Sequence, residues 1–83
     1  MKRDEIIERL RDLLLETDSR SADAIERRGE DAVLSTDLGL SSVGMLYLVI
    51  SIEESFGVLF ENVTMSDFVT LRDVVDYLEE KTR

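Results

Sequence analysis

The sequence predicts an all-α fold, built as a small bundle of three or four helices. Its 83 residues provide material for one hydrophobic core, so we expect a single domain spanning residues 1–83. The chain has no proline and only four glycines, and it therefore lacks most of the residues that mark the turns between short strands. Three segments also carry apolar residues at helical spacing.

The first predicted helix ends near residues 16–17. Asp4 and Glu5 occupy its first turn, where carboxylates interact favourably with the positive end of the helix dipole. Its apolar residues recur at i, i+4, i+7 and i+8, and they are Ile6, Leu10, Leu13 and Leu14. This pattern predicts an amphipathic helix with one buried face.

A polar connection follows over residues 17–36, and it is longer than most loops in compact domains. We expect it to contain a short surface helix over residues 21–28, with Ile25 as its one large apolar contact. Val33 and Leu34 are expected to hold the later part of the connection against the core.

The middle helix is predicted to begin at Ser41 or Ser42, because serine is a favoured N-cap, and to end at Gly57. It carries apolar residues on two sides. One stripe consists of Met45, Leu48, Val49, Ile52 and Phe56, and the opposite one of Val43, Leu46, Tyr47 and Ile50. A helix in a small bundle buries one stripe easily but not two. The chain between residues 58 and 69 covers the second stripe, or part of the stripe stays exposed as a docking surface, or both hold at different residues.

The last helix is predicted to follow the N-cap Thr70, with Asp73 in place of the glutamate of a capping box. Its apolar stripe consists of Leu71, Val74, Val75 and Leu78. Lys81 and Arg83 oppose the negative end of its dipole. Just before this helix, residues 64–68 predict one helical or 3₁₀ turn with Phe68 facing inward.

Composition argues against several classes of protein. With 19 acidic and 10 basic residues, the formal charge of −9 leaves no basic face for nucleic acid. Hydrophobic residues make up 43% of the chain, too many for intrinsic disorder. No apolar run is long enough to cross a bilayer, and the first residues lack the apolar stretch of a signal peptide. The cytoplasm is therefore the expected location.

The residue types that most often carry catalysis are also missing. The chain has neither histidine nor cysteine, which removes histidine-based triads, thiolate nucleophiles and zinc–thiolate sites. Ligand spacing typical of a calcium loop is absent as well, so no metal site is predicted. The sequence argues against a self-contained enzyme, and a small hydrolase or isomerase using carboxylates is the distant alternative.

Acidic residues dominate the middle of the chain. Between Arg28 and Arg72 there is no lysine or arginine. The same interval holds Glu30, Asp31, Asp37, Glu53, Glu54, Glu61 and Asp67, which therefore form a run of acids unopposed along the chain. One interpretation is a solvated surface that keeps the protein soluble. The other is a patch that attracts basic partners, with the apolar residues of the middle helix prolonging the contact.

Repulsion among these acids predicts a domain that is stabilised by added salt or divalent cations, because ions screen like charges. Thermal melts at increasing ionic strength are expected to show a rising midpoint. A flat or falling midpoint would contradict the expectation.

The segment DLGLSSV at residues 37–43 lies where the polar connection enters the middle helix. Gly39 permits a turn that a Cβ atom would obstruct, while Leu38 and Leu40 can anchor the segment to the core. A serine at a helix start is most often only a cap. It also lies beside free backbone N–H groups and the positive end of the dipole, where a phosphate is favoured.

DLGLSSV, followed by Leu46, Val49, Glu53-Glu54 and Phe56-Gly57, resembles the acyl carrier protein family. In that family Asp-Leu-Gly-x-Asp-Ser-Leu opens the second helix, which ends in an acidic Glu-Glu-x-Phe-Gly sequence. The first helix and residues 70–78 look like the first and last helices of the family, so the resemblance covers effectively the whole chain.

The resemblance implies a four-helix bundle of three main helices and a short third helix, with 4′-phosphopantetheine attached to Ser42. A phosphopantetheinyl transferase would move this group from coenzyme A, and its thiol would carry acyl groups as thioesters between partner enzymes of fatty-acid, polyketide or related biosynthesis. The basic docking surfaces of these enzymes would contact Val43, Leu46, Tyr47, Ile50, Glu53 and Glu54. We expect a monomer that enters no membrane and performs no catalysis itself.

Three residues depart from the family pattern. Ser41 replaces the aspartate before the modified serine, which makes Ser41 the alternative attachment site. Gly44 stands where a polar or acidic residue is common, and Tyr47 where fatty-acid carriers often have an acid. These changes favour a specialised carrier, for a polyketide, an unusual lipid or an amino acid. The alternative function is an acidic helical protein-interaction module that is never modified.

Overall fold

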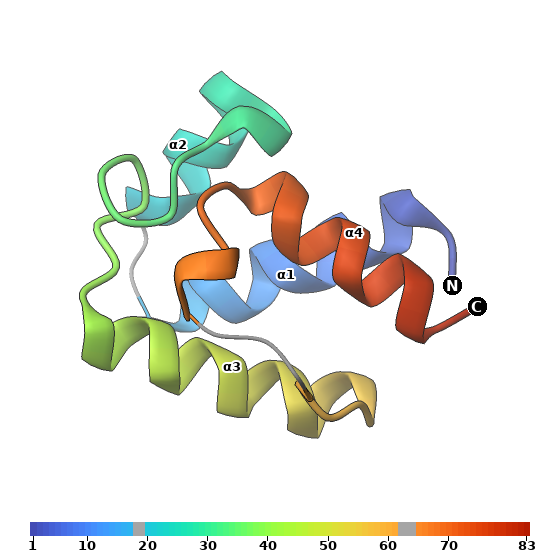
Figure 1. The fold of residues 1–83 in the computed structure, drawn as a ribbon. Helices are drawn as coiled ribbons and strands as arrows, with labels where there is room; N and C mark the ends of the chain where they lie inside the picture. Colours follow the sequence, from blue (N-terminus) through green and yellow to red (C-terminus); the bar gives the residue numbers. More distant parts are fainter. Residues whose placement is uncertain (18–19, 62–64) are drawn as a thin grey trace.

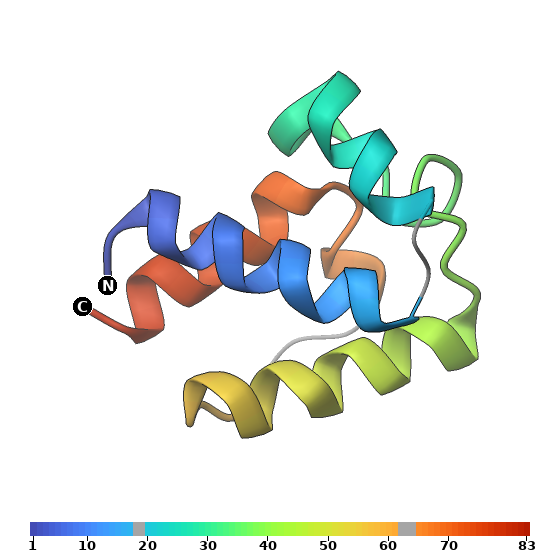
Figure 2. The same ribbon diagram turned by 180° about the vertical axis from the view of Figure 1, so that it is seen from behind.

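The computed structural model describes residues 1–17, 20–61 and 65–83, and this part of the chain forms a helical bundle (Figure 1). Its elements are α1 (Arg3–Thr17), α2 (Arg20–Arg28), the 3₁₀ turn η1 (Gly29–Asp31), α3 (Ser42–Phe56), the 3₁₀ turn η2 (Met65–Asp67) and α4 (Leu71–Lys81). Helix α1 packs against the other three helices, with α2 and α3 on opposite sides of it in both ribbon views (Figures 1 and 2). The predicted all-α bundle is confirmed, and the short element before the last helix is a 3₁₀ turn.

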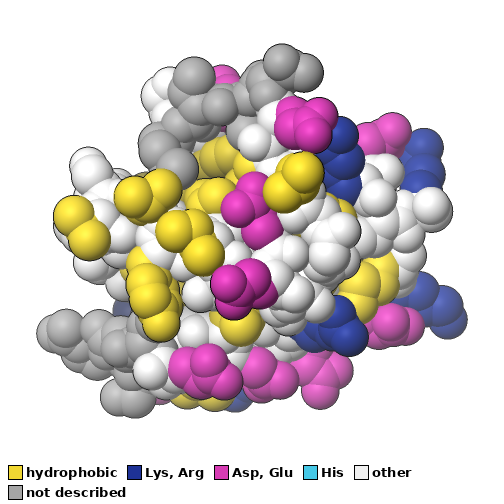
Figure 3. Space-filling model, turned by 90° about the horizontal axis from the view of Figure 1, so that it is seen from below, with side chains coloured by type: hydrophobic (Ala, Val, Ile, Leu, Met, Phe, Trp, Pro, Cys, Tyr) yellow, Lys and Arg dark blue, Asp and Glu magenta, His cyan; other side chains and the backbone are white. Residues whose placement is uncertain are grey.

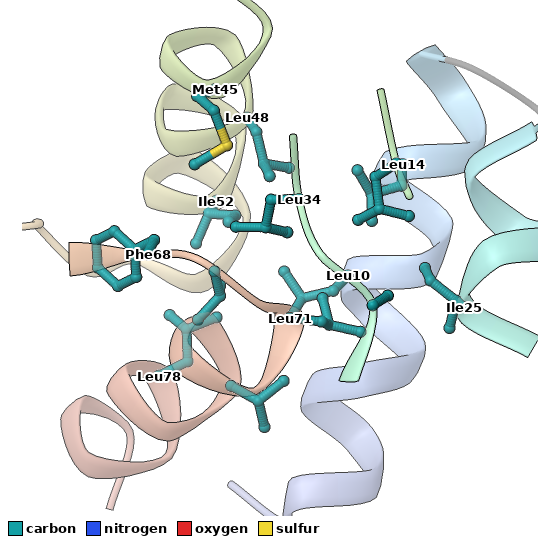
Figure 4. Close-up of a cluster of buried hydrophobic side chains, with 14 of the residues drawn as sticks. Leu10, Leu14, Ile25, Leu34, Met45, Leu48, Ile52, Phe68, Leu71 and Leu78 are labelled. Carbon is teal, nitrogen blue, oxygen red and sulfur yellow. The ribbon is translucent and has the colours of Figure 1, made fainter. Parts of the chain in front are cut away.

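The core is made by the stripes that the sequence predicts. Ile6, Leu10 and Leu14 of α1 are at most 1% exposed. They meet Met45, Leu48 and Ile52 of α3 and the four predicted apolar residues of α4, all of which are buried (Figure 4). Leu13, Val49 and Phe56 are only half-buried, because they lie at the edges of their stripes. Each main helix therefore contributes one face to a single core.

Backbone hydrogen bonds fix the polar connection to α4. Val33 and Thr70 form an isolated antiparallel bridge. The N–H of Leu34 donates to Val69 O at 2.9 Å, and the N–H of Leu71 donates to Ala32 O at 2.9 Å. The expectation that residues 33–34 anchor this segment is confirmed. Helix α2 also forms where predicted, with Ala24 and Ile25 buried, whereas η1 directly after it was not predicted.

An aromatic cluster closes the side of the bundle between η2 and α4. Phe68 is 8% exposed and faces inward as predicted. Its ring lies 5.5 Å from that of Phe60 and 5.8 Å from that of Tyr77. The Tyr77 hydroxyl donates to Leu59 O and accepts the N–H of Glu61, both at 3.1 Å. The described part of residues 58–69 is thus held against α4. Thr64, the first residue of the predicted turn, lies outside the described residues.

Helix α4 begins with the capping box that the sequence predicts. The Asp73 carboxylate accepts the backbone N–H groups of Val69 at 2.8 Å and Thr70 at 3.0 Å. These two hydrogen bonds to the charged form hold the pKa of Asp73 below its usual range. Asp73 is therefore a source of pH-dependent stability.

We expect Asp73→Ala to lower the free energy of unfolding by about 1 kcal/mol at pH 7, as for other lost N-terminal caps. Because the folded-state pKa is depressed, the contribution is fully present above the unfolded pKa of about 4 and disappears as the pH falls through the folded value. In thermal melts from pH 3 to 7, the difference in melting midpoint between wild type and Asp73→Ala should shrink at low pH. Glu80→Ala, which removes an exposed carboxylate from the last turn of α4, is the control and should open no such gap. A difference in melting midpoint that does not change with pH would contradict the assignment of pH-dependent stability to Asp73.

Candidate functional site

The loop before α3 holds the start of that helix at the surface. Leu38 is buried and Leu40 is half-buried against the core, while Gly39 between them has φ +66°, a conformation that glycine adopts without strain. The Asp37 carboxylate accepts the N–H of Val33 at 2.8 Å. The predicted anchoring of this segment is confirmed. Since both ends of the loop are fixed, the two serines that follow are presented in a defined position.

The two adjacent serines have different roles. Ser41 is the N-cap of α3: its backbone is extended, and its Oγ accepts the N–H of Gly44 at 3.2 Å. Ser42 is the first residue of the helix and is exposed. Within the described residues its hydroxyl makes no hydrogen bond. The backbone N–H groups of Ser42 and Val43, in the first turn, have no partner within the helix, and the dipole adds a positive potential there. A phosphate attached to the Ser42 hydroxyl would lie in this favourable field.

The second apolar stripe of α3 is exposed. Val43 is 77% exposed, Leu46 54%, Tyr47 60% and Ile50 47%. In Figure 3, which looks onto the molecule from the α3 side, hydrophobic and acidic side chains lie together on this face. The interpretation that residues 58–69 cover this stripe is therefore wrong for these side chains. The aromatic residues of that segment pack toward α4 instead, through Phe60 and Phe68.

The two predicted acids at the end of this face differ in their environment. Glu53 is half-buried, and its Oε2 accepts the N–H of Phe60 at 3.0 Å, so its carboxylate holds the chain after α3 in place. Glu54 is exposed. Glu54 is thus better placed than Glu53 to meet an incoming basic side chain.

Within the described residues, Glu30, Asp31 and Asp37 have arginine partners in the fold, so these acids are unopposed along the sequence but not in space. Arg28 lies 3.1 Å from the Asp37 carboxylate. The Arg72 guanidinium pairs with Asp31 at 2.6 Å, and Arg3 pairs with Glu30. The reason is that η1 packs beside α4, which brings Arg3 and Arg72 next to acids far from them in sequence.

Arg3 is the centre of this charged cluster. It also contacts Asp76 at 2.7 Å and Glu79 at 3.2 Å. Its hydrogen bonds to Glu30 and Asp76 raise the pKa of the guanidinium above its already high value. The cluster joins α1, η1 and α4.

A shallow cleft of about 240 Å³ adjoins Ser42 on the side of η2. We call it the α3/η2 cleft, and its lining includes Leu40, Ser41, Ser42, Met45, Ser66 and Phe68. The periodicity of the sequence does not predict this cleft, because residues from α3 and from the η2 region, distant in sequence, line it together. Within the described residues, no cluster of acidic side chains is arranged to hold a metal ion. No helix of the described residues is long and apolar enough to cross a membrane.

Comparisons with known proteins agree with the motif that precedes α3. Residues 8–78 match the sequence model of a family described as "Phosphopantetheine attachment site". An acyl carrier protein of Campylobacter hominis is 32% identical over 75 residues, which cover 90% of this chain and 91% of that protein. An acyl carrier protein of Coprothermobacter proteolyticus is 30% identical over 79 residues, covering 95% and 93%. One from Thermotoga maritima is 36% identical over 52 residues, covering 63% and 64%.

Proposed function

Because the chain belongs to the acyl carrier protein family and contains its phosphopantetheine attachment domain, we propose that the Ser42 hydroxyl receives the 4′-phosphopantetheine group. The single observation that supports this choice of serine is the difference between the two neighbours. Ser41 Oγ is engaged as the helix cap, whereas Ser42 Oγ is exposed and without a hydrogen bond among the described residues. Only Ser42 can be modified without removing the cap.

The residues around Ser42 fit a covalently attached phosphate. Ser42 Oγ would attack a phosphorus of the coenzyme A pyrophosphate, forming a P–O bond as the P–O bond to the nucleotide half breaks. A base of the transferase would take the hydroxyl proton, since the chain contains no histidine or cysteine to do so. The N–H groups of Ser42 and Val43 face the anionic diester that results. Once bound, the group supplies the thiol that carries the acyl chain as a thioester.

We further propose that α3 is the surface that partner enzymes contact. Val43, Leu46, Tyr47 and Ile50 would supply the apolar contacts, and Glu53 and Glu54 the acidic ones. The partners in this proposal are the transferase and acyl-transferring or acyl-modifying enzymes with basic docking surfaces, and catalysis belongs to them. The carrier itself would act as a monomer in the cytoplasm.

Reversing one charge on this surface is expected to slow recognition. Glu54→Lys should reduce the kcat/KM of a phosphopantetheinyl transferase about tenfold at low salt, because it replaces an attraction to a basic surface by repulsion. The effect should shrink as salt is added. Glu26→Lys is the matched control, since Glu26 is an exposed acid on α2, across the bundle from α3 (Figure 1). Equal effects of the two variants would argue against a docking role for α3.

Intact mass spectrometry tests the attachment directly. The protein is incubated with coenzyme A and several phosphopantetheinyl transferases of broad specificity, and a mass increase of one phosphopantetheine is expected. If none of the transferases modifies the protein, the exposed face of α3 would instead serve an unmodified acidic interaction module.

A further inference from the structure

A groove of about 350 Å³ lies between α1 and α2, whereas α3 packs on the opposite side of α1 (Figures 1 and 2). We call it the α1/α2 groove. Its lining includes Asp4, Ile7, Glu8 and Arg11 of α1 and Ile25 and Glu26 of α2. Ile25 is buried and Ile7 is half-buried, while the three acids are exposed. The groove thus combines an apolar floor with an acidic rim.

Two acids of the groove belong to a longer row along α1. Asp4, Glu8, Asp12 and Glu16 follow one another at intervals of four residues, and all four are exposed. Such residues lie on neighbouring turns of a helix, about 6 Å apart along its axis. None of the four forms an ion pair within the part of the chain that the structure describes. We call these residues the acidic row.

The acidic row is unfavourable for α1 itself. Like charges four residues apart repel each other on a helix. Glu16 also lies in the last turn, which contains no basic residue, although the helix dipole favours a cation there. Departures from local rules that nothing within the fold offsets are typical of functional surfaces. A cationic partner would turn this repulsion into attraction.

The arginines of α1 do not neutralise the acidic row. Arg3 belongs to the charged cluster beside α4, and Arg9 donates a hydrogen bond to Ser55 O at 3.3 Å, at the end of α3. Arg11 lies in the groove, but its guanidinium pairs with Glu26 of α2. Cations that meet the row would therefore come from another molecule.

We propose that the α1/α2 groove binds a basic amphipathic helix of a partner protein. Lysine or arginine side chains four residues apart on that helix would match the spacing of the acidic row. The apolar side of the same helix would cover Ile7 and Ile25. A second copy of this chain is a poor occupant, because two molecules of charge −9 repel each other. The same charge repels anionic lipid surfaces and nucleic acids.

Binding at this groove does not require the attachment at Ser42. Because α2 and α3 lie on opposite sides of α1, a helix in the groove would leave the exposed face of α3 open to a transferase (Figure 2). The groove would hold the carrier beside one protein while its serine meets others. Such tethering raises the effective concentration of the carrier at its partners without any new contact to them.

The binding test uses a capped synthetic peptide of lysine and leucine, with lysine at every fourth position and the leucines on one side of the helix. In NMR titrations, the backbone amides of Glu8, Asp12 and Glu26 should shift, while those of Leu46 and Ile50 should not. A peptide of the same composition in scrambled order, which forms no apolar side, should bind about tenfold more weakly. Equal binding of the two peptides, or shifts on α3 as large as those on α1, would overturn the proposal.

Glu8→Lys is the variant that tests the acidic row. It should weaken peptide binding about tenfold at low salt and less as salt is added. Glu80→Lys makes the same change in net charge at an exposed position of α4, outside the groove, and should leave the affinity unchanged. Without peptide, Glu8→Lys should melt at a higher temperature than the wild type, because repulsion by Asp4 and Asp12 becomes attraction. A lower melting midpoint, or an equal loss of affinity in both variants, would contradict the role of the row.

A transferase assay tests whether the groove and α3 act independently. Saturating peptide should leave the rate of phosphopantetheine transfer to Ser42 unchanged. If the peptide slows transfer as strongly as Glu54→Lys does, it occupies α3 and the proposal is wrong. If the protein alone dimerises in analytical ultracentrifugation and Glu8→Lys abolishes the dimer, the occupant is a second copy and the proposal is equally wrong.

The two proposals can fail separately. If no transferase modifies the protein, the attachment at Ser42 is wrong, and the peptide titration still decides whether the groove binds a basic helix. If Ser42 is modified but the ordered peptide binds no better than the scrambled one, the carrier function stands and the groove is not a docking site.

Discussion

Ser42→Ala is expected to abolish phosphopantetheinylation completely, with no mass increase after prolonged incubation with coenzyme A and transferase. The attachment needs a nucleophilic oxygen at that position, and alanine removes it while keeping a residue suited to the first turn of α3. The variant should remain folded, because the Ser42 side chain is exposed and no hydrogen bond of the described residues is lost. Circular dichroism and a thermal melt check this.

Ser41→Ala is the control for this substitution, and we expect it to be modified but to be less stable than the wild type. The variant keeps the Ser42 hydroxyl and should still gain one phosphopantetheine. It loses the cap to Gly44 N–H, so the free energy of unfolding should fall by about 1 kcal/mol and the melting midpoint by roughly 4–8 °C. Modification of Ser42→Ala together with an unmodified Ser41→Ala would assign the attachment to Ser41 instead.

Ile52→Ala should have the largest effect on stability. Ile52 is 1% exposed and faces the core from the middle of α3. Removing a buried isoleucine side chain costs about 2–5 kcal/mol, because transfer free energy is lost and a cavity remains. For 83 residues a total stability of roughly 4–12 kcal/mol is typical, so this substitution is expected to remove a large part of it. Urea denaturation monitored by circular dichroism measures the change.

Ile50→Ala, two residues away on the same helix, separates stability from recognition. Ile50 is 47% exposed on the opposite stripe, so its replacement should change the free energy of unfolding by less than about 0.5 kcal/mol. We expect it to weaken transferase recognition instead, because an apolar contact of the docking surface is lost. If Ile50→Ala destabilises as much as Ile52→Ala, the assignment of the two faces of α3 is wrong.

The helices could be predicted because their signals are local. Ser41 caps α3, Gly57 ends it with φ +68°, and Asp73 caps α4, and each of these interactions joins residues within a few positions of one another. Helical periodicity identified the core stripes for the same reason. The attachment motif was also readable, since it occupies consecutive positions at the start of one helix.

The features that could not be predicted depend on contacts between residues distant in sequence. The partners of Glu30 and Asp31 lie at Arg3 and Arg72, and no local rule connects these positions. The exposure of Tyr47 could be decided only when the described part of residues 58–69 was seen to pack toward α4. The apolar hollow lined by Leu13, Gly44 and Tyr47 likewise exists only where α1 and α3 meet, although Gly44 and Tyr47 are unusual in the sequence.

The N-terminal ammonium group donates a hydrogen bond to Thr82 O at 2.7 Å, so the two ends of the chain meet at one pole of the bundle. The start of α3 lies at the other pole in both ribbon views (Figures 1 and 2). A linker or an immobilising tag on either end would therefore leave the start of α3 on the side of the bundle away from the support. The protein is suited to display on a bead or sensor surface, where the binding of partner enzymes could be measured on an oriented layer.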